Sequence, residues 1–230
     1  KTKCLHGLGD EGINAKGNGK SRRQDGESTC ARTSSVNTAS HLNQCLPHFF
    51  FERNTVRVAK DLIGKYLVRK VDSQWLCARI VETEAYLEKG DPAAHCRRGP
   101  TPRAKIMFGP AGLIYVYFIY GNYFLLNFVT EKEGSAGAVL VRAVEPIDGI
   151  QKMVELRNFN KKNLIHLTNG PAKLVLALGI DGSLNGKPLG LPHLAVCDGL
   201  KVHDSQIIAT TRIGISKGEA LPFRFYEKMN

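Results

Sequence analysis

The sequence predicts a single α+β domain in which a mostly antiparallel sheet is flanked by helices. Apolar runs that fit strands follow one another across short turns containing Gly, Asn or Asp, as antiparallel hairpins do. Runs with helical spacing stand apart from these strands instead of alternating with each one. The length of 230 residues fits one domain, or one domain plus a tail.

Residues 1–48 are expected to form a tail outside this domain. Up to about residue 45 they are poor in large apolar side chains and rich in Gly, Ser, Asn and charge. They would bury too little surface to offset the entropy of ordering. The basic stretch Lys16–Arg23 could add phosphate contacts or act as a nuclear-import signal, although a solvated linker explains it more simply. The domain itself is expected at residues 49–230.

A short helix and then a hairpin are predicted at the start of the domain. The helix begins at Asn54 or Thr55, both good N-caps, and stops at Gly64, which can end a helix. The hairpin has strands at 65–71 and 75–86, joined by an Asp-Ser turn.

The middle of the chain combines a long loop with an aromatic hairpin. Residues 88–110 are rich in Gly, Pro and Arg and have no regular period, which predicts an ordered or functional loop. Two aromatic and β-branched runs, 113–120 and 123–129, surround a Gly-Asn turn and predict a hairpin. Tyr120 and Tyr123 would flank its tip. A ring there could push between stacked bases, or it could pack back on its own hairpin.

The second half of the domain is predicted to add one long strand, two helices and a set of short strands. The strand spans 136–144, and Pro146 is expected to open the first helix. The second helix is opened by Pro171 and ends near Gly179. Short strands are then expected near 194–202, 205–215 and 221–226.

The composition of the chain narrows the choice of binding partners and cofactors. The net charge of +11 favours a polyanion, with nucleic acid first and an anionic membrane surface second. No apolar run approaches the roughly 20 residues needed to span a bilayer. The cysteines include no C-x-x-C pair and the histidines lack metal-ligand spacing. We therefore expect thiols in a reducing compartment, no metal and no cofactor.

Two glutamates stand in an apolar strand. Alternation would place Glu82, Glu84 and Tyr86 on one face, as in a catalytic pocket, although a solvated acidic face gives the same pattern. Arg142 interrupts another apolar strand, where a lone cation must be paired, and a nearby glutamate is the simplest partner. That pairing could be purely structural.

The chemistry that these residues could perform is limited by what the sequence lacks. G-x-S-x-G, Walker, G-x-G-x-x-G and H-E-x-x-H motifs are absent, so the enzyme classes that depend on them lose their usual support. Aromatic walls, one carboxylate base and a hairpin wedge are what hydrolysis of a base from duplex DNA requires. The alternative is a non-catalytic module that binds bent duplex DNA or structured RNA. Glu84 favours the enzyme over the binding module, because an acidic side chain repels phosphate and serves no purpose in simple binding.

A series of short motifs follows in order from about Phe49 to Tyr226: Val81-Glu-Thr-Glu-Ala-Tyr86, Ala93-Ala-His95, Thr101-Pro-Arg103, Met107-Phe108, Tyr115-Val-Tyr117, Tyr120-Gly121, Asn127, Val139-Leu-Val-Arg-Ala143, Glu145-Pro146, Asn169-Gly-Pro-Ala-Lys-Leu174 and Arg224-Phe-Tyr226. This series resembles the alkyladenine (3-methyladenine) DNA glycosylase family. The resemblance implies a curved antiparallel sheet with a protruding, DNA-inserting hairpin. It also implies a monofunctional enzyme of base-excision repair that flips alkylated or deaminated purines and leaves an abasic site.

The same resemblance assigns roles to residues of this chain. Glu84 would be the general base that activates water, and Arg142 would help to hold that water. Asn127 would lie on the pocket floor and discriminate against a guanine amino group, and Tyr120 would fill the vacated stack. Glu82 has no such role and would be structural. Three flat side chains would enclose the flipped purine: Tyr86, His95 and Tyr117.

The resemblance also sets the partners and leaves some points open. The expected partner is double-stranded DNA with damaged purines, bound by a monomer at the chromosome, in a bacterial cytoplasm or a eukaryotic nucleus. The choice among 3-methyladenine, 7-methylguanine, hypoxanthine and ethenoadenine stays open. Ala104 stands where the family often has asparagine. The segments Arg79–Leu87 and Tyr117–Asn127 contain no lysine that could form a Schiff base.

Overall fold

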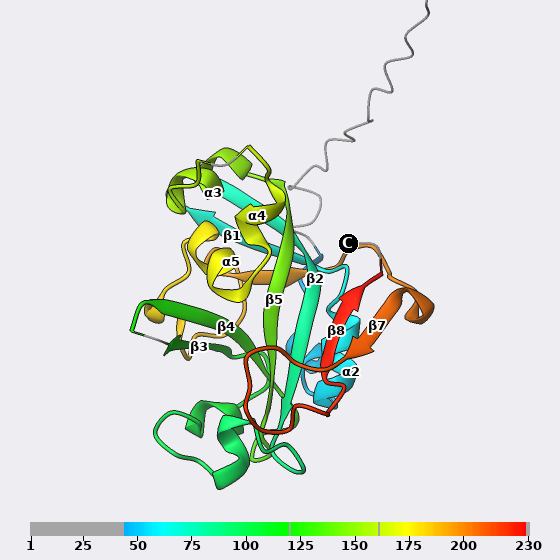
Figure 1. Cartoon of the computed structure of the whole chain (residues 1–230). Coiled ribbons are helices and arrows are strands. Elements are labelled where there is room, and N and C mark those ends of the chain that lie inside the picture. The colour runs from blue at the N-terminus through cyan, green and yellow to red at the C-terminus, as the bar shows by residue number, and fades with distance from the viewer. Residues whose placement is uncertain (1–43, 120, 161, 229–230) are drawn as a thin grey trace, which may run out of the picture. The chain divides into compact units, whose positions relative to one another are not determined.

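The computed structural model describes residues 44–119, 121–160 and 162–228 (Figure 1). In these residues eight strands form one antiparallel sheet, in the order β3-β4-β5-β2-β1-β6, with β8 paired to β2 and β7 paired to β8. Four α-helices accompany the sheet. The predicted α+β class with a mostly antiparallel sheet is confirmed.

The elements have the following bounds. The strands are β1 Tyr66–Val71, β2 Gln74–Leu87, β3 Ile114–Ile119, β4 Tyr123–Thr130, β5 Gly137–Asp148, β6 Ala195–Cys197, β7 Ile207–Thr210 and β8 Arg224–Glu227. The α-helices are α2 Thr55–Asp61, α3 Ile150–Leu156, α4 Ile165–Thr168 and α5 Pro171–Ala177. Short 3-10 helices lie at His48–Phe50, His95–Arg98, Lys105–Phe108, Gly182–Leu184 and Asp204–Gln206.

The first helix and hairpin form where the sequence predicts them. The Asn54 side chain accepts a hydrogen bond from the Arg57 N–H at 3.2 Å and so caps α2. Gly64 follows the helix with a φ of +87°, and a Cβ there would lie 2.4 Å from the Leu200 carbonyl oxygen. Asp72, with a φ of +53°, turns the chain from β1 into β2.

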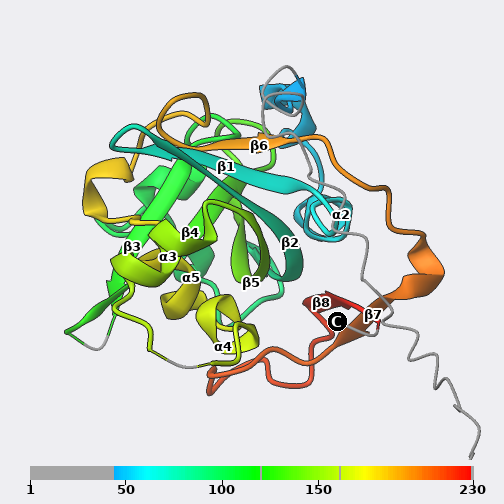
Figure 2. The same cartoon turned by 90° about the horizontal axis from the view of Figure 1, so that it is seen from above.

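Strand β2 is the axis of the fold and positions the site. Near its start it pairs with β1, and from Cys77 onward it pairs with β5. From Glu82 to Glu84 it lies between β5 and β8 (Figure 2). The pairing with β5 shifts register on both sides of Glu82, as at a β-bulge. Thr83 donates from its hydroxyl to the Ala59 carbonyl of α2 at 2.8 Å. Alternation therefore directs Glu84 away from α2.

The prediction that Pro146 opens a helix is wrong, because Pro146 lies in β5 opposite Ala78. Strand β4 pairs with β5 only from Gly137 to Leu140, so the outer edge of β5 has no strand neighbour at Pro146. A missing N–H costs no ladder hydrogen bond there. The helix α3 begins later, after Gly149.

Other departures from the prediction are small. The loop predicted at 88–110 contains two 3-10 helices. Helix α4 has four residues, which is too short for helical periodicity to reveal. The last three strands are shorter than predicted. Helices α3, α4 and α5 gather on one side of the sheet, and α2 lies elsewhere, against β2 (Figures 1 and 2).

The predicted tail falls largely outside the described residues, which begin at residue 44. Leu46, just before the expected start of the domain, donates its N–H to the Val196 carbonyl of β6 at 2.7 Å. The division at residue 48 therefore stays a prediction. No helix in the described part of the chain has the length and apolar character needed to cross a bilayer.

Candidate active site

Glu84 lies at the centre of the candidate site and is fully buried. Its Oε2 accepts the Tyr86 hydroxyl at 2.8 Å, and its Oε1 accepts the Ile213 backbone N–H at 3.0 Å. Arg142 Nη1 forms an ion pair with the same Oε1 at 3.1 Å. Burial, and then the Glu84 charge, raise the pKa of Tyr86, so its hydroxyl stays protonated and donates. These donors compensate for the loss of water around the carboxylate.

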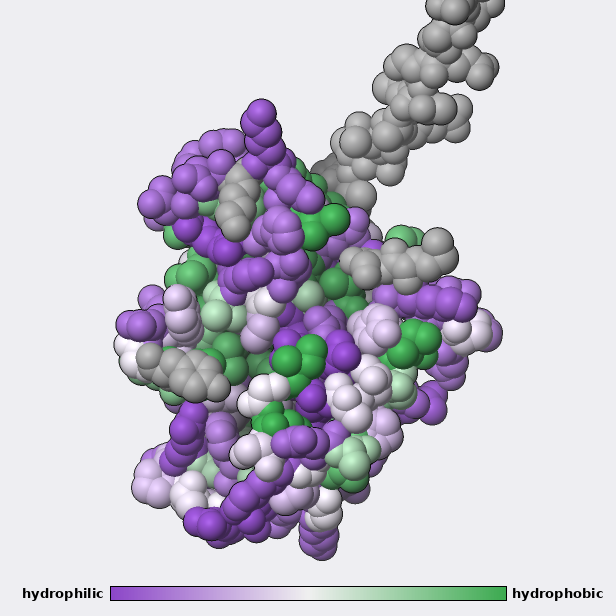
Figure 3. Space-filling view, viewed as in Figure 1, coloured by the Kyte–Doolittle hydropathy of each residue, from purple (hydrophilic) through white to green (hydrophobic). Residues whose placement is uncertain are grey.

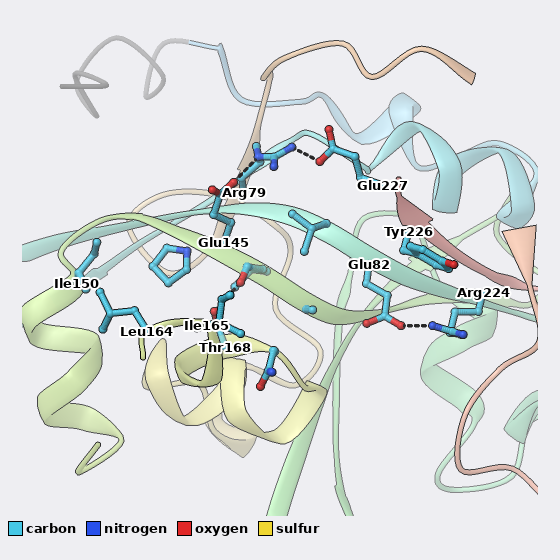
Figure 4. A pocket seen from close by; sticks show the side chains of 15 residues that line it. Arg79, Glu82, Glu145, Ile150, Leu164, Ile165, Thr168, Arg224, Tyr226 and Glu227 are labelled. Atoms are coloured by element: carbon cyan, nitrogen blue, oxygen red, sulfur yellow. Dashed lines mark hydrogen bonds and ion pairs between the residues drawn. The ribbon is translucent and has the colours of Figure 1, made fainter. Parts of the chain in front are cut away.

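Arg142 joins the two glutamates of β2. Its Nε contacts Glu82 Oε1 at 3.2 Å, while its Nη1 contacts Glu84. The two carboxylates therefore reach the same cation, as alternation and the predicted pairing indicated. Glu82 also accepts from Arg224 Nη1 at 2.8 Å (Figure 4). With two arginines on one oxygen, Glu82 is held as an ion-pair partner.

An aromatic cavity is connected to Glu84 through Tyr86, which lines the cavity and donates to Glu84, whereas Glu84 is not one of the wall residues. The His95 Nδ1 lies 2.9 Å from the Tyr115 hydroxyl, and the His95 and Tyr117 rings meet edge to face at 4.8 Å. The cavity has a volume of about 20 Å³, enough for one water molecule. Its walls are Tyr86, Ala93, His95, Met107, Tyr115, Tyr117, Asn127 and Ala138. All four residues predicted to contact a purine line this one cavity.

Among the polar wall residues, Asn127 has a defined hydrogen bond and His95 a defined charge. Asn127 is buried and donates its amide to the Tyr115 carbonyl at 3.2 Å. Burial, and then the charge of Arg103, lower the pKa of His95 to about 4, which leaves the imidazole neutral at physiological pH. Arg103 lies over the outer part of the site, with its Cζ 4.7 Å from the Tyr117 ring centroid.

The sequence did not reveal three contributors to the site. The Ile213 N–H reaches Glu84 from a segment 129 residues away. Arg212, its neighbour, makes a fully buried double hydrogen bond to Asp91 at 2.7 and 2.6 Å. Tyr115 completes the cavity wall. Neither periodicity nor spacing relates Ile213 or Asp91 to the glutamates, whereas Tyr115 shares the face of Tyr117 by alternation and could have been found.

The predicted wedge, Tyr120, lies outside the described residues. The two strands on either side of it form a hairpin. Strands β3 and β4 pair from Ile114 opposite Phe128 to Ile119 opposite Tyr123. Near its tip Tyr123 is 42% exposed and Phe118 is 50% exposed. Phe118 also packs against Phe124 at 4.9 Å. Insertion of the hairpin into DNA stays a prediction.

A larger groove of about 860 Å³ lies beyond Glu82, between β2, β5, β8 and the helices α3 and α4 (Figure 4). Its charged side chains are already paired: Arg79 contacts Glu145 and Glu227, and Arg224 contacts Glu82. The molecular face of Figure 3 is mainly hydrophilic, with smaller apolar areas between the polar ones. The groove is thus chemically distinct from the aromatic cavity.

Comparison with known proteins adds a family match. Residues 49–230 match the family model described as Methylpurine-DNA glycosylase. A protein of Carboxydothermus hydrogenoformans, provisionally named 3-methyladenine DNA glycosylase, is 47% identical over 186 residues, which cover 80% of this chain and 96% of that protein. Proteins with the same provisional name from Alkaliphilus oremlandii and Methanoculleus marisnigri are 46% and 48% identical. They cover 79% and 80% of this chain, and 94% and 95% of their own lengths.

Proposed function

Because the chain belongs to the methylpurine-DNA glycosylase family, as its motifs predicted, we propose that it removes alkylated or deaminated purines from duplex DNA. DNA glycosylase is the enzyme class of that family. The purine would be flipped into the aromatic cavity, and water would hydrolyse its N-glycosidic bond. The product would be an abasic site, as the first step of base-excision repair.

The observation that carries this proposal is the fully buried Glu84, which is not itself a wall residue of the aromatic cavity but accepts a hydrogen bond from one, Tyr86. Tyr86 is shared by both, because it lines the cavity and donates to Glu84. A carboxylate oxygen can accept two hydrogen bonds. Oε2 receives one from Tyr86, so its other lone pair would accept from a water molecule that reaches Glu84 when the cavity opens.

Glu84 would take a proton from that water as it attacks the sugar carbon, while the electrons of the glycosidic bond leave with the purine. The carboxylate charge would also stabilise the oxocarbenium-like sugar. Arg142, at 3.1 Å, would keep the carboxylate oriented and help to hold the water. Glu82 is engaged by two arginines and has no part in this step.

Entry of a purine requires the cavity to open, because about 20 Å³ holds a water molecule and no base. We infer that His95 and Tyr117 exchange their mutual contact at 4.8 Å for contacts with the base. A ring pair contributes about 0.5–1.5 kcal/mol, whereas stacking of a base on an aromatic side chain contributes about 1–3 kcal/mol. Contacts with the base would therefore offset the loss of the ring pair, and the separate cost of unstacking the base from the duplex is smallest for a damaged or mismatched base.

The tyrosine walls and the neutral His95 of the cavity favour alkylated purines that carry a positive charge. Alkylation at ring nitrogens gives a purine a positive charge, and tyrosine faces attract cations. His95 is neutral at physiological pH, because burial and then Arg103 lower its pKa to about 4. It therefore adds no charge that would repel a cationic base.

The remaining features of the proposal concern the partner. A net charge of +11 favours duplex DNA and predicts binding that weakens steeply with salt. Tyr120, outside the described residues, would fill the gap left by the flipped nucleotide. We propose that the protein acts as a monomer on chromosomal DNA. No lysine occurs among the residues that line the cavity, which supports water as the nucleophile.

A base-release assay over a lesion panel tests this function. Duplexes with one 3-methyladenine, 7-methylguanine, hypoxanthine or ethenoadenine are incubated with the protein and then cleaved at abasic sites with alkali. An undamaged duplex of the same sequence is the control. Release from at least one lesion duplex is expected, and binding without release from any of them would favour the non-catalytic DNA-binding alternative. Borohydride trapping of the protein on damaged DNA would contradict the monofunctional mechanism.

A further inference from the structure

We propose that the buried pair of Asp91 and Arg212 is a positioning pair that holds Glu84 and Tyr86 in their reactive arrangement. This inference rests on the proposed base-excision function. Neither residue lines the aromatic cavity, and neither touches Glu84 through its side chain in the described contacts. Their effect would pass through the backbone of Ile213 and the ring of Tyr86.

Arg212 contacts the backbone and the aromatic ring next to Glu84. Its guanidinium donates to Asp91 through two nitrogens and to the Ala85 carbonyl at 2.9 Å. Its Cζ lies 4.6 Å from the centroid of the Tyr86 ring. Ala85 stands between Glu84 and Tyr86 in β2, so one arginine braces the strand and the ring at the same place.

Asp91 joins a second segment to this strand. Its Oδ2 accepts the Leu87 N–H at 3.1 Å, and its Oδ1 accepts the Ala93 N–H at 3.0 Å. Ala93 lines the cavity, and His95 follows two residues later. The pair thus ties together the end of β2, the start of the loop that carries His95, and the segment that contains Ile213.

The Ile213 N–H is the contact that depends most on this arrangement. Ile213 is 52% exposed, and its backbone N–H is the group that reaches Glu84. A side-chain donor can adjust by changing rotamer, whereas a backbone donor is placed only by its chain. Arg212, directly before Ile213 and with its side chain fully buried, fixes that chain.

The energetics favour a positioning role over a purely stabilising one. Burying two charges is costly, and apolar residues of similar size often stabilise a fold as well or better. Arg212 Nε is buried with no hydrogen-bond partner among the described residues, and so is Arg69 Nε, which makes Arg69 a matched comparison. The bonds that the pair does make all serve segments that carry site residues.

Variants with a matched control test this inference. Arg212→Lys keeps the charge but loses the double hydrogen bond. Asp91→Asn keeps the shape but replaces one acceptor oxygen with an NH2 donor, which would face a backbone N–H and an Arg212 N–H. The control is Arg69→Lys, because Arg69 also braces backbone, at the His193 and Gly179 carbonyls, but contacts no site residue. Thermal unfolding, binding to lesion duplex and single-turnover base release are measured for each protein.

We expect Arg212→Lys to lower the single-turnover rate by about 10- to 100-fold, with affinity for lesion duplex changed by less than about threefold. Arg69→Lys should leave the rate within about twofold, even at an equal loss of melting temperature. Combining Arg212→Lys with Tyr86→Phe should cost less than the product of the two single effects, because both act on Glu84. Equal rates for Arg212→Lys and Arg69→Lys would overturn the proposal.

Hydrogen exchange of the unmodified protein covers the case in which the variants do not fold. The Ile213 amide should exchange much more slowly than the Gly214 and Lys217 amides, and equally fast exchange would overturn the proposal.

Failure of the proposed function and failure of the positioning role give different results. If the unmodified protein releases no purine, the proposed function fails. If it releases purine and Arg212→Lys behaves as Arg69→Lys does, the positioning role alone fails.

Discussion

Replacing Glu84 with glutamine should abolish base release while leaving the fold and DNA binding largely intact. The substitution removes the general base, whose contribution is typically about 10²- to 10⁴-fold, and the negative charge beside the developing oxocarbenium ion. At about 1.4 kcal/mol for each factor of ten, the barrier should rise by about 3–6 kcal/mol from the base alone.

The contacts of Glu84 indicate that the protein will survive this change. Glutamine keeps a carbonyl oxygen that can accept from the Ile213 N–H and from Arg142. Its new amide can donate to the Tyr86 oxygen, since a hydroxyl both donates and accepts. Arg142 also keeps Glu82 at 3.2 Å. The cost should be about 1–3 kcal/mol, within the total stability of about 5–15 kcal/mol typical of a domain.

The assay compares Glu84→Gln with Glu82→Gln in single-turnover base release and in lesion-duplex binding. Glu82→Gln is the matched control, because Glu82 shares Arg142 with Glu84 but is paired to Arg224 as well and lines a different groove. We expect Glu82→Gln to retain release within about tenfold. Full activity in Glu84→Gln, or an equal loss in both variants, would refute the assignment of Glu84.

Further predictions concern the wedge, the salt dependence, the buried histidine and one turn. Tyr120→Ala should weaken binding to lesion duplex by about 1–3 kcal/mol, the scale of one stacked base. Unchanged affinity in a titration would exclude Tyr120 as the side chain that fills the vacated stack. Binding of the unmodified protein should fall linearly in a plot of log K against log salt, and a flat plot would contradict phosphate contacts. The folded-state pKa of His95 is lowered to about 4 from 6.5, so the unfolded state binds more protons between these values and stability should fall as pH drops through that window. His95→Gln should flatten this slope in melting curves, and an identical slope would show that other groups set it. Gly149→Ala should lower the melting temperature, because Gly149 has a φ of +71° and its Cβ would lie 2.5 Å from the Trp75 carbonyl oxygen.

Local patterns in the sequence were sufficient for much of the fold. The cap at Asn54, the stop at Gly64 and the turn at Asp72 act through neighbouring residues, so they can be recognised without tertiary context. The same holds for the aromatic hairpin, whose two runs pair across a short turn. Alternation in β2 also placed Glu82 and Glu84 on one side, where both contact Arg142.

Tertiary structure decided what these local patterns leave open. Pro146 is tolerated in β5 because β4 does not extend along that part of the strand, and no property of the proline itself indicates this. The different surroundings of Glu82 and Glu84 likewise depend on Arg224 and on the Ile213 N–H, which come from far along the chain.

The sequence by itself determined the α+β class, the hairpins and the motifs that identify the family. Only the folded chain brings Asp91 to Arg212, and Ile213 to Glu84, across separations of 121 and 129 residues. Periodicity and turn chemistry report which face a side chain takes and where the chain reverses. They do not report which distant segment covers that face, because such contacts follow from the packing of the whole sheet.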